Sequence, residues 1–229
     1  MNKSIILLSG GVDSAVSLAM CKEKENIELA LFFDYGHKSF LQEKKAVAKL
    51  CEYYGIKLEI IELPWLKAIT KTALVSDTEN IPELKNNELD NKNITKDSAK
   101  KVWVPNRNGV FINIAAAYAD SYGYEKIIIG ANKEEGETFP DNSKAFINNA
   151  TQTLNFSTQV KAKVIAPLID LNKCEIMLVG KSLNFPFEMV RSCYTDNETH
   201  CGECESCKRL KRGLIEAGLS EIANLMFTD

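Results

Sequence analysis

The stretch Ser9-Gly10-Gly11-Val12-Asp13-Ser14 decides the fold of this chain. It follows an apolar run, Ile5-Ile6-Leu7-Leu8, which is typical of a buried strand, and it precedes an amphipathic helix predicted over residues 15–24. Two adjacent glycines can adopt positive φ and carry no Cβ, so backbone N–H groups can close around an anion at the positive end of that helix. The stretch therefore predicts a phosphate-binding turn.

This turn differs from two common nucleotide-binding loops, because it has neither the Gly-x-x-x-x-Gly-Lys-[Ser/Thr] pattern nor three spaced glycines. It resembles the Ser-Gly-Gly-x-Asp-Ser loop of the N-type ATP pyrophosphatases, or PP-loop proteins, which cleave ATP to AMP and pyrophosphate while they adenylate a substrate. The resemblance implies that Asp13 lies in the magnesium region and is catalytic. The ATP-binding residues that it implies on and beside the loop are Leu8, Ser9, Gly10, Gly11, Val12, Asp13 and Ser14.

Strand and helix patterns alternate along most of the chain. Strands are predicted over residues 28–34, 57–61, 126–130 and 164–165, and helices over 40–53, 110–122, 143–156 and 173–183. This alternation predicts an α/β fold in which a parallel, doubly wound, Rossmann-like sheet is connected by right-handed crossovers. Ligands of such sheets bind at the carboxyl ends of the strands, where the glycine turn lies. The PP-loop resemblance makes this sheet one of the adenine nucleotide alpha hydrolase-like type.

Changes of composition divide the chain. Residues 1–185 carry the α/β pattern, which we interpret as the ATP-pyrophosphatase domain, and residues 186–229 form a small helical tail rich in cysteine. Within the first part, residues 76–101 are rich in Asn, Asp, Glu, Lys and Thr and have no sustained period. We expect this polar insertion to be mobile or ordered by ligand, and we hypothesise that it closes over the site as a lid.

The charge, the length of the apolar runs and the cysteine count indicate which kinds of partner and location to expect. The net charge is −3, and charges of both signs are spread along the sequence, so nothing in the charge favours a stable nucleic-acid partner. No apolar run approaches the length of about 18 residues that a membrane-spanning helix needs, and no cleavage site follows the first apolar run. We therefore expect a soluble, cytoplasmic protein that does not bind membranes. Seven cysteines in such a chain favour metal ligands or buried thiols over disulfides.

Four cysteines predict a metal site near the end of the chain. Their spacing is C-x7-C-x2-C-x2-C, in which thiolates two residues apart can reach one tetrahedral ion: Cys193, Cys201, Cys204 and Cys207. We expect one structural zinc ion per subunit, because four thiolates leave no open position for water. An iron–sulfur cluster held by the same thiolates is the alternative. The remaining cysteines, Cys21, Cys51 and Cys174, lie in apolar helical patterns and are expected to be core thiols.

With the loop at one end and the cysteines at the other, the chain resembles the 7-cyano-7-deazaguanine synthases of the queuosine precursor pathway. Further matching motifs are Phe33-Asp34-Tyr35-Gly36, Val104-Pro105-Asn106-Arg107-Asn108, Phe139-Pro140-Asp141, Pro167-Leu168 and Ser192-Cys193-Tyr194. The resemblance implies an ATP-dependent ligase that forms a C–N bond. Such a ligase converts 7-carboxy-7-deazaguanine and ammonia, through an amide, to the nitrile called preQ0. It also implies ATP, Mg²⁺ and Zn²⁺ as cofactors and a homodimer.

Several residues of these motifs are candidates for the site. Arg107 is expected to be catalytic, because its planar fork can bind phosphate or carboxylate, the alternative being a solvated loop arginine. Asp34 closes a strand, where it can bind magnesium or a ribose hydroxyl or cap a turn. Asp141 can bind the guanine-like edge of a substrate or simply begin a helix. Tyr35, Trp103 and Phe139 are candidate stacking surfaces for a planar base, and packing in the core is the alternative for each of them.

The sequence departs from the resembled family at two places beside these motifs. Where the family usually reads Tyr-Gly-Gln-Arg-His, this chain has Tyr35-Gly36-His37-Lys38-Ser39, so Lys38 is the basic residue expected to be catalytic. Before Phe139 the family typically carries an aspartate, for which Glu135 is the candidate substrate-binding carboxylate. These departures keep two alternatives open. One is another PP-loop adenylating enzyme, such as a tRNA thiolase or an amidotransferase-like ligase, and the other is a non-catalytic nucleotide-binding module.

Overall fold

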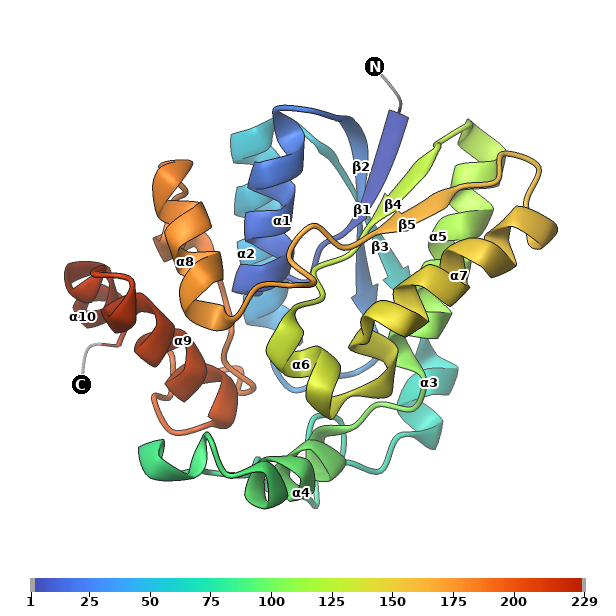
Figure 1. Ribbon diagram of the computed structural model, residues 1–229. Helices are drawn as coiled ribbons and strands as arrows, with labels where there is room; N and C mark the ends of the chain where they lie inside the picture. The colour runs from blue at the N-terminus through green and yellow to red at the C-terminus, as the bar shows by residue number, and fades with distance from the viewer. Residues whose placement is uncertain (1–2, 228–229) are drawn as a thin grey trace.

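The computed structural model describes residues 3–227 and contains a parallel sheet with helices on both faces (Figure 1). Its strands are β1 (Lys3–Leu7), β2 (Asn26–Asp34), β3 (Lys57–Glu62), β4 (Lys126–Ile128) and β5 (Lys163–Ile165). The strand order is β3-β2-β1-β4-β5, and every neighbouring pair is parallel. The chain winds outward from β1 to β3 and then adds β4 and β5 on the other side of β1. This topology confirms the doubly wound α/β fold, and its switch point lies between β1 and β4.

Alternation along β1 divides the hydrophobic core into two layers. Ile6 packs on one face of the sheet and Ile5 and Leu7 on the other, as the period of two requires. The first face is covered by α1 (Val12–Lys22), α2 (Phe40–Tyr54) and α8 (Lys173–Ser182), and the second by α3 (Pro64–Ile69), α5 (Arg107–Tyr122) and α7 (Lys144–Ser157). Among the described residues, no helix combines the length and hydropathy that crossing a membrane requires.

Local capping chemistry fixes several of the predicted helix ends. Gly55 follows α2 with a φ of 63° and donates its N–H to Cys51 and Glu52, as a C-terminal cap in the left-handed region does. Ser143 caps α7, because its side chain accepts the N–H of Phe146. Asn172 and Glu175 form a reciprocal capping box at the start of α8. The capping box fixes where α8 begins, and its first residue, Lys173, contacts Asp13 of the glycine turn.

The cysteine-rich tail packs on the α/β layers. Its helices α9 (Glu205–Glu216) and α10 (Ser220–Met226) lie beside α8 at the left of Figure 1. Leu210, Leu214 and Ala223 are fully or almost fully buried and belong to the same hydrophobic cluster as α1, α2 and α8. The tail thus shares one core with the sheet, while the division at residues 185 and 186 stays a prediction.

The polar insertion contains more structure than its sequence indicated. Helix α4 (Lys92–Val102) and the short 3-10 helix η1 (Asn86–Glu88) form within or at the edge of it. The buried residues of α4 are Thr95, Ser98, Ala99 and Val102, which recur at helical spacing but are mostly small or polar. Periodicity of apolar residues could not reveal such a face. In Figure 1, α4 runs below α6 (Lys133–Thr138) and close to α9.

Candidate active site

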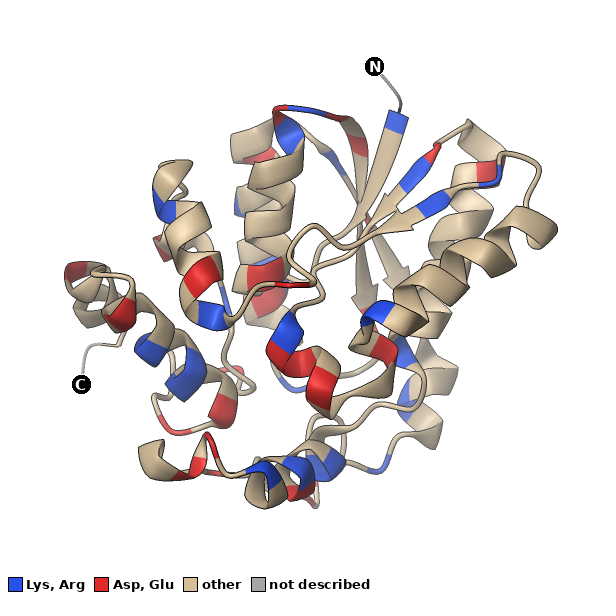
Figure 2. Ribbon diagram, in the orientation of Figure 1, with Lys and Arg blue, Asp and Glu red and all other residues tan. Residues whose placement is uncertain are grey.

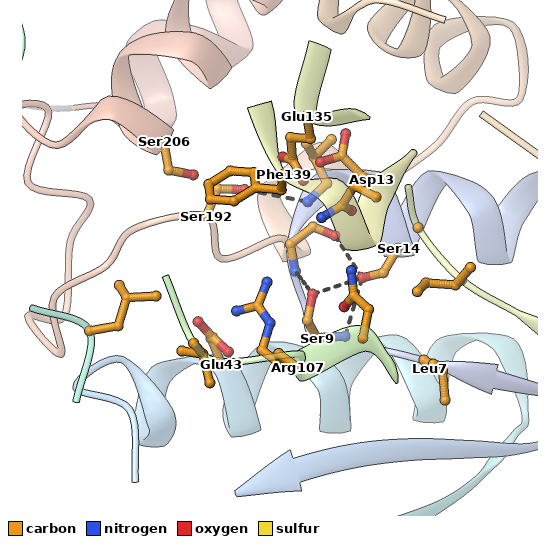
Figure 3. A pocket seen from close by; sticks show the side chains of 18 of the residues that line it. Leu7, Ser9, Asp13, Ser14, Glu43, Arg107, Glu135, Phe139, Ser192 and Ser206 are labelled. Carbon is orange, nitrogen blue, oxygen red and sulfur yellow. Dashed lines mark hydrogen bonds between the residues drawn. The ribbon is translucent and has the colours of Figure 1, made fainter. Parts of the chain in front are cut away.

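A cavity of about 230 Å³ lies at the carboxyl edge of the sheet, where the glycine turn meets α5, α6, α8 and the tail (Figure 3). It brings together most of the site residues that the sequence predicted. Those that line it are Leu8, Ser9, Gly11, Val12, Asp13, Ser14, Tyr35, Arg107, Glu135, Phe139 and Asp141. Gly10, Asp34 and Lys38 are not among the lining residues.

The phosphate loop is held in shape by its own hydrogen bonds. The backbone N–H of Ser9 donates to Ser14 Oγ at 3.2 Å, and that of Gly11 donates to Ser9 Oγ at 3.3 Å. Gly10 has a φ of +80°, and a Cβ there would lie 3.1 Å from the backbone oxygen of Glu43 in α2. Any side chain at Gly10 would therefore strain the backbone and crowd α2. These hydrogen bonds and the close approach of α2 fix the backbone of the loop.

A buried lysine that the sequence analysis missed neutralises the loop carboxylate. Lys173 Nζ lies 2.8 and 2.7 Å from the two carboxylate oxygens of Asp13 and 3.9 Å from Glu135 Oε1. Burial alone would lower the pKa of Lys173, but the carboxylates of Asp13 and Glu135 outweigh it, so the pKa is raised. Lys173 thus places a fixed positive charge beside the loop. Nothing in the sequence indicated this role for Lys173 beyond its position as the first residue of a predicted helix.

Glu135 has a different environment from Asp13. Burial and the negative charge of Asp13 raise its pKa, and the neighbouring Lys173, Arg107 and Asn132 only partly oppose that rise. Its side chain keeps 37% exposure, and Figure 3 shows it beside Asp13 in the cavity. A carboxylate of this kind takes up a proton more readily than an ordinary one.

Arg107 points into the cavity rather than to solvent. Its Nη1 donates to the hydroxyl of Tyr35 at 3.1 Å, and its guanidinium carbon lies 5.8 Å from the centre of that ring. Burial by itself would lower the pKa of Arg107, but nearby Tyr35, Asp141 and Glu135 outweigh that effect, so the pKa is raised above its ordinary value. The Tyr35 ring is stacked at 4.2 Å on the buried His37, whose Nε2 lies 3.0 Å from Glu43 Oε2. The guanidinium is thus charged and fixed in direction.

Two candidate substrate-binding residues, Asp141 and Phe139, are held in place by different neighbours. Asp141 Oδ2 accepts the backbone N–H of Asn108 at 3.0 Å, and its backbone oxygen accepts Asn108 Nδ2 at the same distance. This contact fastens the first turn of α5, a different helix from the one that follows Asp141, and that following helix, α7, is capped by Ser143. Phe139 stacks on Trp103 with ring centres 5.9 Å apart and nearly parallel planes. The pair gives the cavity a flat aromatic wall.

Two predicted residues lie away from the cavity wall. Asp34 Oδ1 accepts the backbone N–H of Gly36 at 2.9 Å, which is the turn-capping alternative. Lys38 Nζ donates to the backbone oxygen of Glu79 at 2.6 Å, on the polar insertion. The catalytic role of Lys38 and the nucleotide-binding role of Asp34 stay predictions. In this structure, Lys173 is the cation that pairs with the loop carboxylate.

The tail completes the wall around the phosphate loop. Ser192 Oγ accepts the backbone N–H of Val12 at 3.3 Å, and the N–H of Arg191 donates to the backbone oxygen of Gly10 at 2.8 Å. Sequence reasoning noted Ser192 only as part of a motif, because nothing local links it to a loop 180 positions earlier. The metal-binding tail and the anion-binding loop are therefore one structural unit.

Charged residues of α9 also join the insertion to α6. Arg209 donates to Glu205 Oε1 and to Glu134 Oε2, each at 2.9 Å, and to the backbone oxygen of Leu89 at 3.2 Å. Ser98 in α4 donates to Glu205 Oε2 at 2.7 Å. Figure 2 shows the basic residues of α9 and α4 and the acidic residues of α6 at this side of the molecule. The insertion is held against the cavity by this network.

The four tail cysteines meet as a tetrahedral metal site requires. Their sulfur atoms all lie within 4.8 Å of one another: Cys193, Cys201, Cys204 and Cys207. The Cys201–Cys207 separation is 3.8 Å, while four sulfurs at the usual zinc–sulfur distance of about 2.3 Å form a tetrahedron with edges of about 3.8 Å. The N–H groups of Thr195 and Cys201 donate to Cys193 Sγ, which favours a thiolate. The donor set fits a closed, four-coordinate ion.

Outside this cluster, the cysteines have no comparable arrangement among the described residues. Burial raises the pKa of the Cys21 and Cys51 thiols to about 11, so both stay protonated in the core. His200, which adjoins the cluster, instead accepts the backbone N–H of Ser192 at 3.3 Å through Nε2.

A Ser-Gly-Gly-x-Asp-Ser loop at the first strand of a parallel, doubly wound sheet, facing a cavity at the switch point, defines a PP-loop nucleotide-binding protein. The fold is similar to that of a 4-thiouridine synthetase solved with RNA and bound ATP. The TM-score is 0.52 and the identity 17%, over 97% of this chain and 53% of the other. The family model described as "Queuosine biosynthesis protein QueC" matches residues 3–218, and the chain belongs to this family.

Relatives with similar sequences support the same family. The 7-cyano-7-deazaguanine synthase of Pelotomaculum thermopropionicum is 48% identical over 217 residues, covering 95% of this chain and 98% of the relative. The protein of the same name from Methanobrevibacter smithii is 49% identical over 220 residues, covering 96% of each chain. The similarity extends over both the phosphate loop and the cysteine cluster.

Proposed function

We propose that the protein is an ATP-dependent ligase that converts 7-carboxy-7-deazaguanine and ammonia to 7-cyano-7-deazaguanine in queuosine biosynthesis. Relatives of that name over nearly the whole chain support the activity. The observation that carries the chemistry is the single cavity in which the phosphate loop, the cations Lys173 and Arg107 and the aromatic pair of Trp103 and Phe139 meet.

The cavity suits the activation of a carboxylate. A substrate carboxylate oxygen attacks the α-phosphorus of ATP, the bond to pyrophosphate breaks, and an acyl-adenylate forms. Negative charge develops on the phosphates, where the loop N–H groups, Lys173 and Arg107 can stabilise it. Because water would hydrolyse the acyl-adenylate, the enclosing insertion and tail serve to keep water away.

Conversion of the amide to a nitrile needs a second activation of the same carbonyl carbon. Ammonia displaces AMP from the acyl-adenylate and yields the amide, whose oxygen is still bonded to carbon. Adenylation of that oxygen turns it into a leaving group, and loss of AMP gives the nitrile. We propose that the flat wall of Trp103 and Phe139 holds the deazaguanine ring during both activations, since planar rings stack favourably on aromatic side chains.

The residues of the chain also suit the two metals that we propose. Mg²⁺ prefers carboxylate and phosphate oxygens, and Asp13 is the carboxylate of the phosphate loop. The four tail thiolates would hold one Zn²⁺ per subunit, which would stabilise the tail and supply no open coordination position. A homodimer, implied by the family resemblance, and a cytoplasmic location, expected from the sequence composition, complete the proposal.

The test is a mass-resolved assay of the purified, zinc-loaded protein with Mg-ATP, ammonium and 7-carboxy-7-deazaguanine. AMP, ADP, amide and nitrile are followed together, and omission of ammonium is the control. We expect nitrile and AMP only when ammonium is present. Amide without nitrile would indicate that the second activation is lost. No AMP from protein that binds ATP would refute this acceptor and favour another PP-loop activity.

A further inference from the structure

The direction of the Arg107 guanidinium depends on one protein partner. Among residues 3–227, its side chain makes a single hydrogen bond, to the Tyr35 hydroxyl at 3.1 Å, and it forms no ion pair with a carboxylate. A guanidinium has several N–H donors, so the others are available to a ligand in the cavity that Arg107 lines. A half-buried positive charge without a direct counter-charge favours an anion there. Tyr35 therefore decides where these donors point.

The Tyr35 ring is in turn held by two other rings. It stacks on His37 with ring centres 4.2 Å apart and planes 21° from parallel, and it makes a tilted contact with Phe111 at 5.9 Å. Tyr35 is only 7% exposed, so its ring cannot turn without displacing these neighbours. His37 makes the closer of the two contacts and covers a face of the tyrosine ring.

His37 is itself anchored by a carboxylate. Its Nε2 lies 3.0 Å from Glu43 Oε2, and Ser39 Oγ donates to the other oxygen of Glu43 at 2.6 Å. The rings of Phe32 and Phe40 make T-shaped contacts with the imidazole at 6.1 and 5.8 Å. The hydrogen bond fixes the position of the imidazole, and the surrounding rings fix its plane. An uninterrupted set of contacts thus runs from Glu43 to the Arg107 guanidinium.

We propose that His37 is a positioning residue, which directs the free N–H groups of Arg107 into the cavity through the ring and hydroxyl of Tyr35. This inference rests on the proposed function, because the charge that Arg107 then stabilises develops when ATP reacts with the substrate carboxylate. His37 does not line the cavity, so it acts without touching a ligand. The sequence analysis noted position 37 only as a departure from the resembled family.

His37→Leu tests this role by removing both the stacking plane and the hydrogen bond to Glu43. ATP–pyrophosphate exchange that depends on 7-carboxy-7-deazaguanine reports adenylation. We expect kcat for exchange to fall about tenfold, which is less than the roughly 10²–10³-fold effect of deleting a donor to developing charge outright. The KM for ATP should stay within about threefold of wild type, because the loop N–H groups and Lys173 are kept.

A double-mutant cycle separates positioning from a general loss of structure. Among the described residues, no hydrogen bond or ring contact joins His37 directly to Arg107. In an Arg107→Met background, His37→Leu should therefore lower kcat by no more than about twofold, because the group through which it acts is gone. Tyr35→Phe keeps the stacked ring but removes the hydroxyl that Arg107 uses, and it should lower kcat about as much as His37→Leu.

Two further variants control the experiment. In His37→Gln, the side-chain amide can still donate to Glu43 and lie flat against Tyr35, so most of the activity should remain. Such recovery would also show that His37 transfers no proton. Phe185→Leu removes a buried ring contact with Phe187 away from the cavity, so it should lower the free energy of unfolding in urea and leave kcat unchanged.

Three outcomes would overturn the inference. A loss of kcat that persists undiminished in the Arg107→Met background would show that His37 acts on another group. Wild-type kcat in His37→Leu would show that Tyr35 and Arg107 keep their positions without the imidazole. Wild-type protein without substrate-dependent exchange would refute the proposed function itself, and this inference with it, whereas the first two outcomes leave that function intact.

Discussion

At the scale of single residues, replacing Lys173 tests how much its buried positive charge contributes to stability and activity. Lys173→Met would leave Asp13 and Glu135 without their shared cation, and breaking a buried pair in this way costs on the order of 3 kcal/mol. We expect urea denaturation to show a decrease of that size in the free energy of unfolding. The mass-resolved assay should show at least a hundredfold loss of AMP formation. Lys144→Met removes an exposed pair with Asp170 and should change the free energy of unfolding by less than about 0.5 kcal/mol.

The raised pKa of Glu135 predicts that the free energy of unfolding depends on pH, and this can be measured without an activity assay. Its pKa is raised in the folded state by burial and by Asp13, so ionisation costs stability once the pH rises above the ordinary carboxyl value of about 4.3. Below that pH the carboxyl is protonated in both states and the cost vanishes. Glu135→Gln should therefore unfold at higher urea concentration than wild type at pH 7, and the difference should disappear near pH 4. An equal difference at both pH values would contradict the raised pKa.

At the scale of elements, the network around α9 predicts how the insertion is held. Arg209→Met would remove hydrogen bonds to Glu134, Glu205 and the backbone of Leu89. Charge-assisted hydrogen bonds contribute about 1.5–3 kcal/mol each, so opening of the insertion, residues 76–101, should become at least about tenfold more frequent. Faster cleavage of this segment by chymotrypsin would show it.

Lys100→Met is the matched control for that experiment, because Lys100 lies in α4 and, among residues 3–227, forms its ion pair with the exposed Asp97 alone. Its cleavage rate should stay at the wild-type value. If ATP and substrate leave the cleavage of wild type unchanged, the lid hypothesis loses its support even though the network exists.

The elements also indicate how far sequence reasoning reaches. Apolar periodicity and caps such as Gly55 predicted the five strands and most long helices to within a few residues, because these features are local. Helix α4 was missed, since its buried face is made of small and polar residues. The contacts of Lys173 and Ser192 could not be predicted, because each joins segments 160 or more positions apart.

At the scale of the whole molecule, the metal site should control both stability and nucleotide binding. The cysteine cluster follows the segment in which Arg191 and Ser192 contact the phosphate loop, so loosening of the cluster would release both contacts. We expect one zinc ion per chain by mass spectrometry. Removal of zinc should lower Tm by more than about 10 °C, since structural zinc in small domains contributes on the order of 10 kcal/mol.

The same treatment should weaken ATP binding, which calorimetry measures directly. Cys201→Ser should reproduce the effects of zinc removal. Cys174→Ser is the control, because Cys174 lies in α8 outside the cluster and should leave zinc content and affinity unchanged. Full ATP affinity in zinc-free protein would show that the tail and the loop are independent.

The hydrogen bond between Val12 and Ser192 also has a consequence for biosynthesis of the protein. The loop leaves the ribosome before the tail, and the hydroxyl that completes it follows 180 positions later. A growing chain can form the β1–α1 turn early but stays unable to bind its nucleotide firmly until the tail has emerged. Translation that stalls before this point would yield a chain that cannot consume ATP.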